Sequence, residues 1–143
     1  MADQPDVIKD VVQVLQDGEK GFADIGEHIK DPQIQAFFMK ESQTRGEFAR
    51  ELESAAGLEH EAGGTATGAM HRYWGDLKAT MGGGDHTLLE TAEQGEDASK
   101  KAYAEALKKT DLQAPVRQLL ERQQSHIISS HNQVKAFRDR KAA

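Results

Sequence analysis

Cysteine is absent from the 143-residue sequence, which excludes disulfides, thiolate metal sites and cysteine nucleophiles. No apolar run approaches the ~20 residues that a membrane-spanning helix needs. The first ten residues carry acids where a secretion signal would have an apolar segment. We therefore expect a cytoplasmic protein without membrane contact.

An excess of basic charge is missing too, because the formal net charge is −6. Binding to duplex nucleic acid needs a clustered cationic face, so no nucleic-acid partner is expected. One short basic cluster stands near the C-terminus, at Arg138, Arg140 and Lys141. Cations are favoured at the C-terminal end of a helix, which explains this cluster without a ligand.

Proline is scarce as well, and two of the three prolines stand where helices should begin. Apolar residues recur at three- and four-residue steps in four long segments, the pattern of amphipathic helices. The first helix should begin near Pro5. The second should have Asp31 as its N-cap and Pro32 as its first residue, and should end near Gly57.

The second half of the chain repeats this organisation. After Gly82–Gly84 the third long helix should be capped by Asp85, or by Thr87 in a capping box with Glu90. The fourth should begin at Thr110 or Asp111. Each long helix has about 25 residues and is roughly 37 Å long.

Residues 57–84 form a connection long enough to run the length of the bundle and return the chain to its starting end. The connection contains four early glycines and then a short amphipathic segment with Met70, Tyr73, Trp74, Leu77 and Met81 on one side. This stripe is either an exposed partner-binding face or, as we favour, the face that packs on the bundle. No strand pattern occurs, so the sequence predicts a single all-α domain over residues 1–143. One long crossover between two helical hairpins is the ferritin-like connection of an up-down four-helix bundle.

Polar residues interrupt the apolar face of every long helix. Glu19 follows Leu15 by four residues, and Glu96 follows Ala92 by four. The other interruptions are Glu41, Thr44, Gln123 and His126. Glu19, Glu41, Glu96 and Gln123 all stand within about one ~5.4 Å turn of their helix midpoints. We expect these side chains to converge on one small volume inside the bundle.

Buried carboxylates need protons, a basic partner, water or a metal ion to offset the cost of burial. A small shift of helix register would bring Asp17, Arg45 or Lys100 to the same place. Two interpretations follow: a metal site, or a core network in which the polar groups bond to one another and to water.

A weak internal repeat relates the two hairpins, because Gln16–Glu19 resembles Glu93–Glu96. Together with other segments, this repeat carries a resemblance to the ferritin-like superfamily. More closely, the chain resembles a family of uncharacterised bacterial four-helix proteins, a domain of unknown function. The segments are Asp17–Phe22, Phe48–Leu52, His71–Trp74, Gly95–Ala98, Tyr103 and Leu119–Gln123.

The ferritin-like pattern has one Glu on each of two helices and Glu-x-x-His on each of the other two. The resemblance implies that Glu19 and Glu96 are the lone glutamates. The two Glu-x-x-His motifs are incomplete. Three residues after Glu41, Thr44 stands where the histidine is expected, and three residues before His126, Gln123 stands where the glutamate is expected. The implied metal ligands are Glu19, Glu41, Glu96 and His126, with Thr44, Tyr103 and Gln123 as hydrogen-bonding neighbours.

Two functions follow from these incomplete registers. The first is a non-catalytic protein, with a stress-related or interaction role and a degenerate central metal site. The alternative is an iron- or manganese-binding carboxylate protein with storage or redox activity. No catalytic residue is predicted, since no Ser-His-Asp arrangement can be argued. The resemblance is compatible with a homodimer or with another protein partner.

Overall fold

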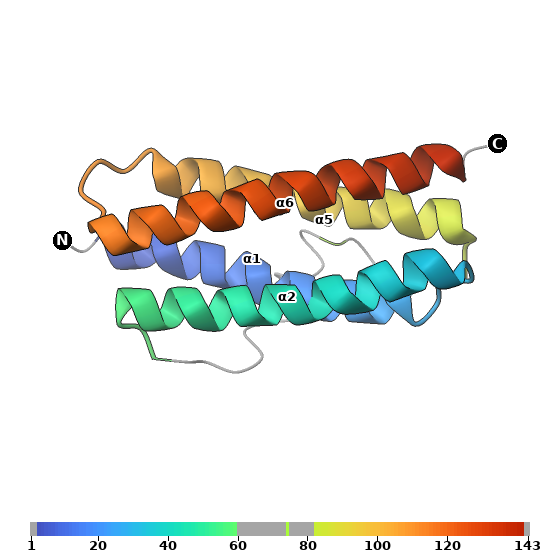
Figure 1. Ribbon diagram of the computed structural model, residues 1–143, viewed down its shortest axis with the longest axis horizontal. Coiled ribbons are helices and arrows are strands. Elements are labelled where there is room, and N and C mark those ends of the chain that lie inside the picture. The colour runs from blue at the N-terminus through green and yellow to red at the C-terminus, as the bar shows by residue number, and fades with distance from the viewer. Residues whose placement is uncertain (1–2, 60–73, 75–81, 142–143) are drawn as a thin grey trace.

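Four long helices make up the structure, which is a computed structural model describing residues 3–59, Trp74 and 82–141. The helices are α1 (Asp3–Gly26), α2 (Pro32–Ala56), α5 (Asp85–Leu107) and α6 (Ala114–Arg140) (Figure 1). No strand occurs in this part of the chain. The predicted all-α four-helix bundle is therefore confirmed.

The turn between α1 and α2 is built as the sequence predicts. Asp31 is the N-cap of α2, and its side chain accepts hydrogen bonds from the backbone of Gln33 and Ile34. Pro32 supplies the first helical residue, where its missing N–H costs nothing. At the other end of α2, Gly57 adopts a left-handed conformation with φ of 71° and ends the helix.

Two predicted helix starts are wrong. Thr87 and Glu90 form no capping box, because α5 already begins at Asp85 with Gly84 as its N-cap. The Asp85 carboxylate instead accepts hydrogen bonds from the backbone of Lys30 and Asp31 across the bundle end. Its partners come from a distant turn, which local sequence cannot reveal.

Helix α6 begins at Ala114, later than the predicted Thr110 or Asp111. Pro115 stands in its first turn, the position that favours proline. Arg117 of α6 stabilises the preceding turn, because its guanidinium donates hydrogen bonds to the carbonyl groups of Leu107 and Lys109.

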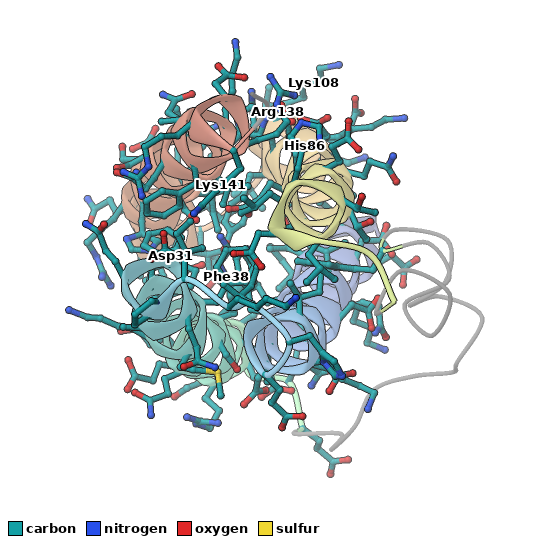
Figure 2. All side chains as sticks on the ribbon, turned by 90° about the vertical axis from the view of Figure 1, so that its right-hand side faces the viewer. Asp31, Phe38, His86, Lys108, Arg138 and Lys141 are labelled. Carbon is teal, nitrogen blue, oxygen red and sulfur yellow. The ribbon has the colours of Figure 1, made fainter. Side chains whose placement is uncertain are left out.

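The helices form a four-membered ring in cross-section (Figure 2). Helix α1 lies beside α2 and α5, and α6 lies beside α5 and α2. Each helix runs antiparallel to its two neighbours, so α2 and α5 run in the same direction (Figure 1). The crossover after Gly57 therefore brings the chain back to the end at which Asp85 meets the α1–α2 turn.

The interior consists of two apolar clusters, one toward each end of the bundle. Phe38 points into the centre of the first cluster, seen end-on in Figure 2. The second cluster surrounds Leu15, Leu52 and Leu120. Between the two clusters, α2, α5 and α6 each contribute buried polar residues, among them Arg45, Glu96 and Ser130. The bundle thus has a polar layer at mid-height.

Trp74 is the described residue of the predicted amphipathic stripe, and it is buried in the first cluster. The prediction that it packs on the bundle is confirmed. The other members of the predicted stripe, Met70, Tyr73, Leu77 and Met81, lie outside the described residues. Among the helices that the structure describes, none is long and apolar enough to cross a membrane.

Candidate functional site

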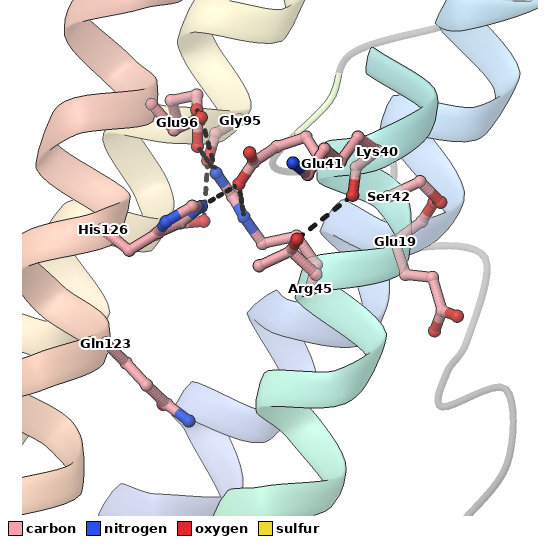
Figure 3. A network of polar contacts seen from close by, with 12 residues as sticks. Glu19, Lys40, Glu41, Ser42, Arg45, Gly95, Glu96, Gln123 and His126 are labelled. Atoms are coloured by element: carbon pink, nitrogen blue, oxygen red, sulfur yellow. Dashed lines mark hydrogen bonds and ion pairs between the residues drawn. The ribbon is translucent and has the colours of Figure 1, made fainter. Parts of the chain in front are cut away.

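Arg45 lies at the centre of the polar layer with a fully buried side chain. It follows Phe38 by seven residues and precedes Leu52 by seven, so α2 directs it into the core. Its Nε donates to Glu41 Oε2 at 3.0 Å, and its Nη2 donates to Glu96 Oε1 at 2.6 Å. One guanidinium thus bridges two buried carboxylates from helices on opposite corners of the bundle (Figure 3).

Ser130 of α6 completes the contacts of Glu96. The same Arg45 Nη2 donates to Ser130 Oγ at 3.0 Å, and that hydroxyl in turn donates to Glu96 Oε2. Both Glu96 oxygens therefore accept hydrogen bonds from buried donors. Because Glu96 is fully buried, its carboxylate needs hydrogen-bond donors from the protein itself.

His126 of α6 connects this cluster to solvent. Its Nε2 lies 2.7 Å from Glu41 Oε2, and it must donate because an ionised carboxylate only accepts. The imidazole is 40% exposed, whereas the Glu41 side chain is 5% exposed. Phe48 stands edge-on against the ring at 5.2 Å and fixes its orientation. We call Glu41, Arg45, Glu96, His126 and Ser130 the central ion network.

The pKa values in this network follow from burial and charge. Burial raises the pKa of Glu41, but the bond from His126 and the charge of Arg45 outweigh burial and leave it below its ordinary value. Burial raises the pKa of Glu96, which the charge of Arg45 and the Ser130 bond offset only in part. Burial lowers the pKa of Arg45, yet the charges of Glu96 and Glu41 hold it above its ordinary value. Arg45 therefore stays a cation.

The outer side of the guanidinium faces α1. Its carbon lies 4.7 Å from the centre of the Phe22 ring, a cation–π distance. Within the described part of the chain, Arg45 Nη1 is buried and has no hydrogen-bond partner. Gly18 of α1 lies beside that atom, and a methyl group at Gly18 would be 3.5 Å from Nη1.

Glu19 does not join the network, contrary to the expected convergence. Figure 3 shows its carboxylate pointing away from Arg45. A methyl group on Gly46 would lie 2.5 Å from Glu19 Oε2, so this glycine of α2 provides the niche that receives the carboxylate. The backbone carbonyl of Glu19 accepts from Ser42 Oγ at 2.7 Å, which fixes the height of α1 against α2. At the height of the network, α1 presents Phe22 in place of an acid.

The predicted neighbours also separate from the network. Thr44 donates its hydroxyl to the Lys40 carbonyl of its own helix. Tyr103 donates to Gln123 Oε1 at 2.8 Å, forming a second buried polar pair within the second apolar cluster. Burial raises the pKa of Tyr103 far above its ordinary value, so the phenol stays a neutral donor.

Gln123 bridges α6 to α2 as well. Its Nε2 lies 3.2 Å from both the Phe48 carbonyl and Glu51 Oε1, and donates toward each. The side chain is fully buried, as its place on the apolar face predicts. Its contacts are structural: they join three helices and leave no group directed at Glu41 or Glu96.

These residues do not fit the metal site that the resemblance implies. Glu41 and Glu96 both bind the guanidinium of Arg45, and a third implied ligand, Glu19, points away from Arg45. Among the described residues, no group of three or more His, Asp or Glu side chains is placed to hold a metal ion. Binding of iron or manganese itself stays untested.

The sequence indicates two members of the network only in part. Arg45 is one of three residues that a shift of helix register brings inward, and no motif marks Ser130. The available signals are spacings: Arg45 follows Glu41 by four residues, and Ser130 follows His126 by four. Such pairs share a helix face, so an inward Glu41 brings Arg45 with it.

Comparison with known families gives one match. The model of a domain of unknown function (DUF2383) matches residues 3–109, about three quarters of the chain. The matched region contains α1, α2, the crossover and α5, and therefore Glu41, Arg45 and Glu96. Helix α6, which contributes His126 and Ser130, follows the matched region. No curated protein gave a significant match.

Proposed function

The chain belongs to the DUF2383 family, and we propose that it is a non-catalytic ferritin-like bundle with a built-in cation in place of metal ions. The observation that carries this proposal is the Arg45 guanidinium between Glu41 and Glu96. The ferritin-like topology is supported by the parallel course of α2 and α5, joined by one long crossover.

A guanidinium can replace a metal ion because it neutralises the same carboxylates and donates fixed hydrogen bonds to them. It also repels a metal ion. A divalent cation held ~4 Å from Arg45 would meet a repulsion of about 8 kcal/mol at an effective dielectric constant of ~20. Binding would require Arg45 to leave its place between the two carboxylates, where its side chain is fully buried. We therefore assign the network a structural role.

Because both network carboxylates already have protein partners, we place the function on the outer helix faces. The proposal accordingly assigns the protein an interaction role, in a stress response or otherwise, with a protein partner or a second copy of the chain. The resemblance to ferritin-like bundles, which often pair through helix faces, supports this part.

Metal binding in solution tests the proposal. The protein is expressed in medium supplemented with iron and manganese, analysed for metal content, and heated with Mn(II) or, anaerobically, Fe(II). Saturation at 100 times Kd would stabilise the fold by ~2.7 kcal/mol, which a melting curve detects. We expect substoichiometric metal and no shift.

The control is the Glu41→Gln/Glu96→Gln double variant, which lacks both network carboxylates. Stoichiometric metal in the wild type, with a thermal shift that this variant abolishes, would establish the alternative of an iron or manganese protein and overturn our proposal. One observation favours that alternative: the 40% exposed His126 ring lies 2.7 Å from the Glu41 carboxylate, which places a nitrogen and an oxygen ligand side by side.

A further inference from the structure

Trp74 occupies the boundary between α1 and α5. Its side chain is 1% exposed, and it is the one tryptophan of the chain. A methyl group on Gly21 of α1 would lie 2.6 Å from the indole Cδ2. A methyl group on Gly95 of α5 would lie 2.3 Å from Cε2. The indole therefore fills the space that side chains at both positions would need.

Both distances are shorter than any real carbon contact, and the obstructing atoms belong to a rigid ring. A flexible side chain could move aside, whereas an indole between two helices cannot without leaving. Glycine inside a helix is destabilising relative to alanine, so these two glycines need a compensating gain. Burial of a large aromatic surface in matched contact with two helix backbones provides that gain.

Two further walls complete the space. The Phe22 ring stands edge-on to the indole, with centroids 5.2 Å apart and planes inclined by 72°. Gly18 lies at the inner end, where a methyl group would be 3.9 Å from indole Cζ2 and 3.5 Å from Arg45 Nη1. The buried Arg45 Nη1 without a described partner is thus directed toward the same end.

We infer that Gly18, Gly21, Phe22 and Gly95 form a binding slot specific for an indole ring, which the chain fills with its own Trp74. The ligand class of the slot is a planar, fused bicyclic aromatic without charge. Gly21 and Gly95 determine its specificity because their missing side chains set its width. The slot lies beside the central ion network, so a filled slot also keeps water from the α1 side of Arg45.

The fluorescence of Trp74 reports directly on this slot, since no other tryptophan contributes. In the intact protein we expect blue-shifted emission and little quenching by acrylamide. Gly21→Ala and Gly95→Ala should each move the emission maximum to the red and raise the quenching constant several-fold. Gly84→Ala is the matched control, because a methyl group there meets nothing within 4 Å. Wild-type emission and quenching in both slot variants would overturn the inference.

A second experiment empties the slot. Trp74→Ala retains no tryptophan, so the emission of added indole measures binding without background. We expect a saturable blue shift of indole emission, which excess phenol reverses only weakly, and no shift in Trp74→Ala/Gly95→Ala. Absence of a shift in a Trp74→Ala protein that is helical by circular dichroism would contradict the inference. If Trp74→Ala does not fold, the two glycine variants decide the matter alone.

Discussion

Replacing Arg45 with methionine removes the cation of the central ion network and keeps most of the apolar stem. Two carboxylates, Glu41 and Glu96, then stay buried without their shared partner. Removing one member of a buried ion pair costs about 3–5 kcal/mol. Total stabilities of single domains are about 5–15 kcal/mol, so the loss is a large fraction of the whole. At roughly 3 °C per kcal/mol for a chain of this size, the melting temperature should fall by about 10–15 °C.

A compensated variant separates lost charge balance from lost packing. In Arg45→Met/Glu41→Leu/Glu96→Leu, no buried charge is left uncompensated, and such replacements are often neutral or stabilising by about 1–4 kcal/mol. Lys20→Met is the matched control, because Lys20 pairs with Asp24 on the surface and exposed pairs contribute little. Urea unfolding followed by circular dichroism gives the free energies.

The reasoning is refuted if Arg45→Met is as stable as Lys20→Met. It is also refuted if the triple variant is as unstable as Arg45→Met, since the cost would then come from packing rather than charge.

Two further predictions concern the polar layer. Tyr103→Phe removes the donor to Gln123 Oε1 and should cost about 1–3 kcal/mol, because a buried acceptor is left unsatisfied; an unchanged urea midpoint would show that the pair contributes nothing. The folded pKa of Glu41 lies below its ordinary value, so the unfolded state binds more protons between that pKa and about pH 5, and stability rises with pH there. Glu41→Gln should make this rise shallower, and identical pH profiles of unfolding free energy for both proteins would contradict the assigned shift.

Local chemistry explains which parts of the fold the sequence could predict. Asp31, Pro32 and Gly57 act within one turn of their own positions, so their roles follow from sequence spacing. Asp85 caps a turn 54 residues away in the chain, and only the assembled bundle brings them together. In the same way, the helices themselves follow from local sequence patterns, whereas the precise start of α6 does not.

The candidate site shows a similar limit. Glu41, Glu96 and Gln123 are buried as predicted, because their places on the apolar faces fix the direction of their side chains. Glu19 stands at the boundary of its apolar face, and the niche opened by Gly46 on another helix decides its direction. Arg45 has a long side chain whose partners depend on three helices, so its spacing from Glu41 indicates only part of the network.

The central claim is that the Arg45 guanidinium is permanently held between two buried carboxylates. Arginine-detected ¹⁵N nuclear magnetic resonance tests it directly, with Arg45→Lys to assign the signal. Buried, hydrogen-bonded N–H groups exchange slowly with water, so the wild type should show one guanidinium whose Nη protons persist while those of surface arginines average out. Fast exchange with water at every arginine would contradict the account.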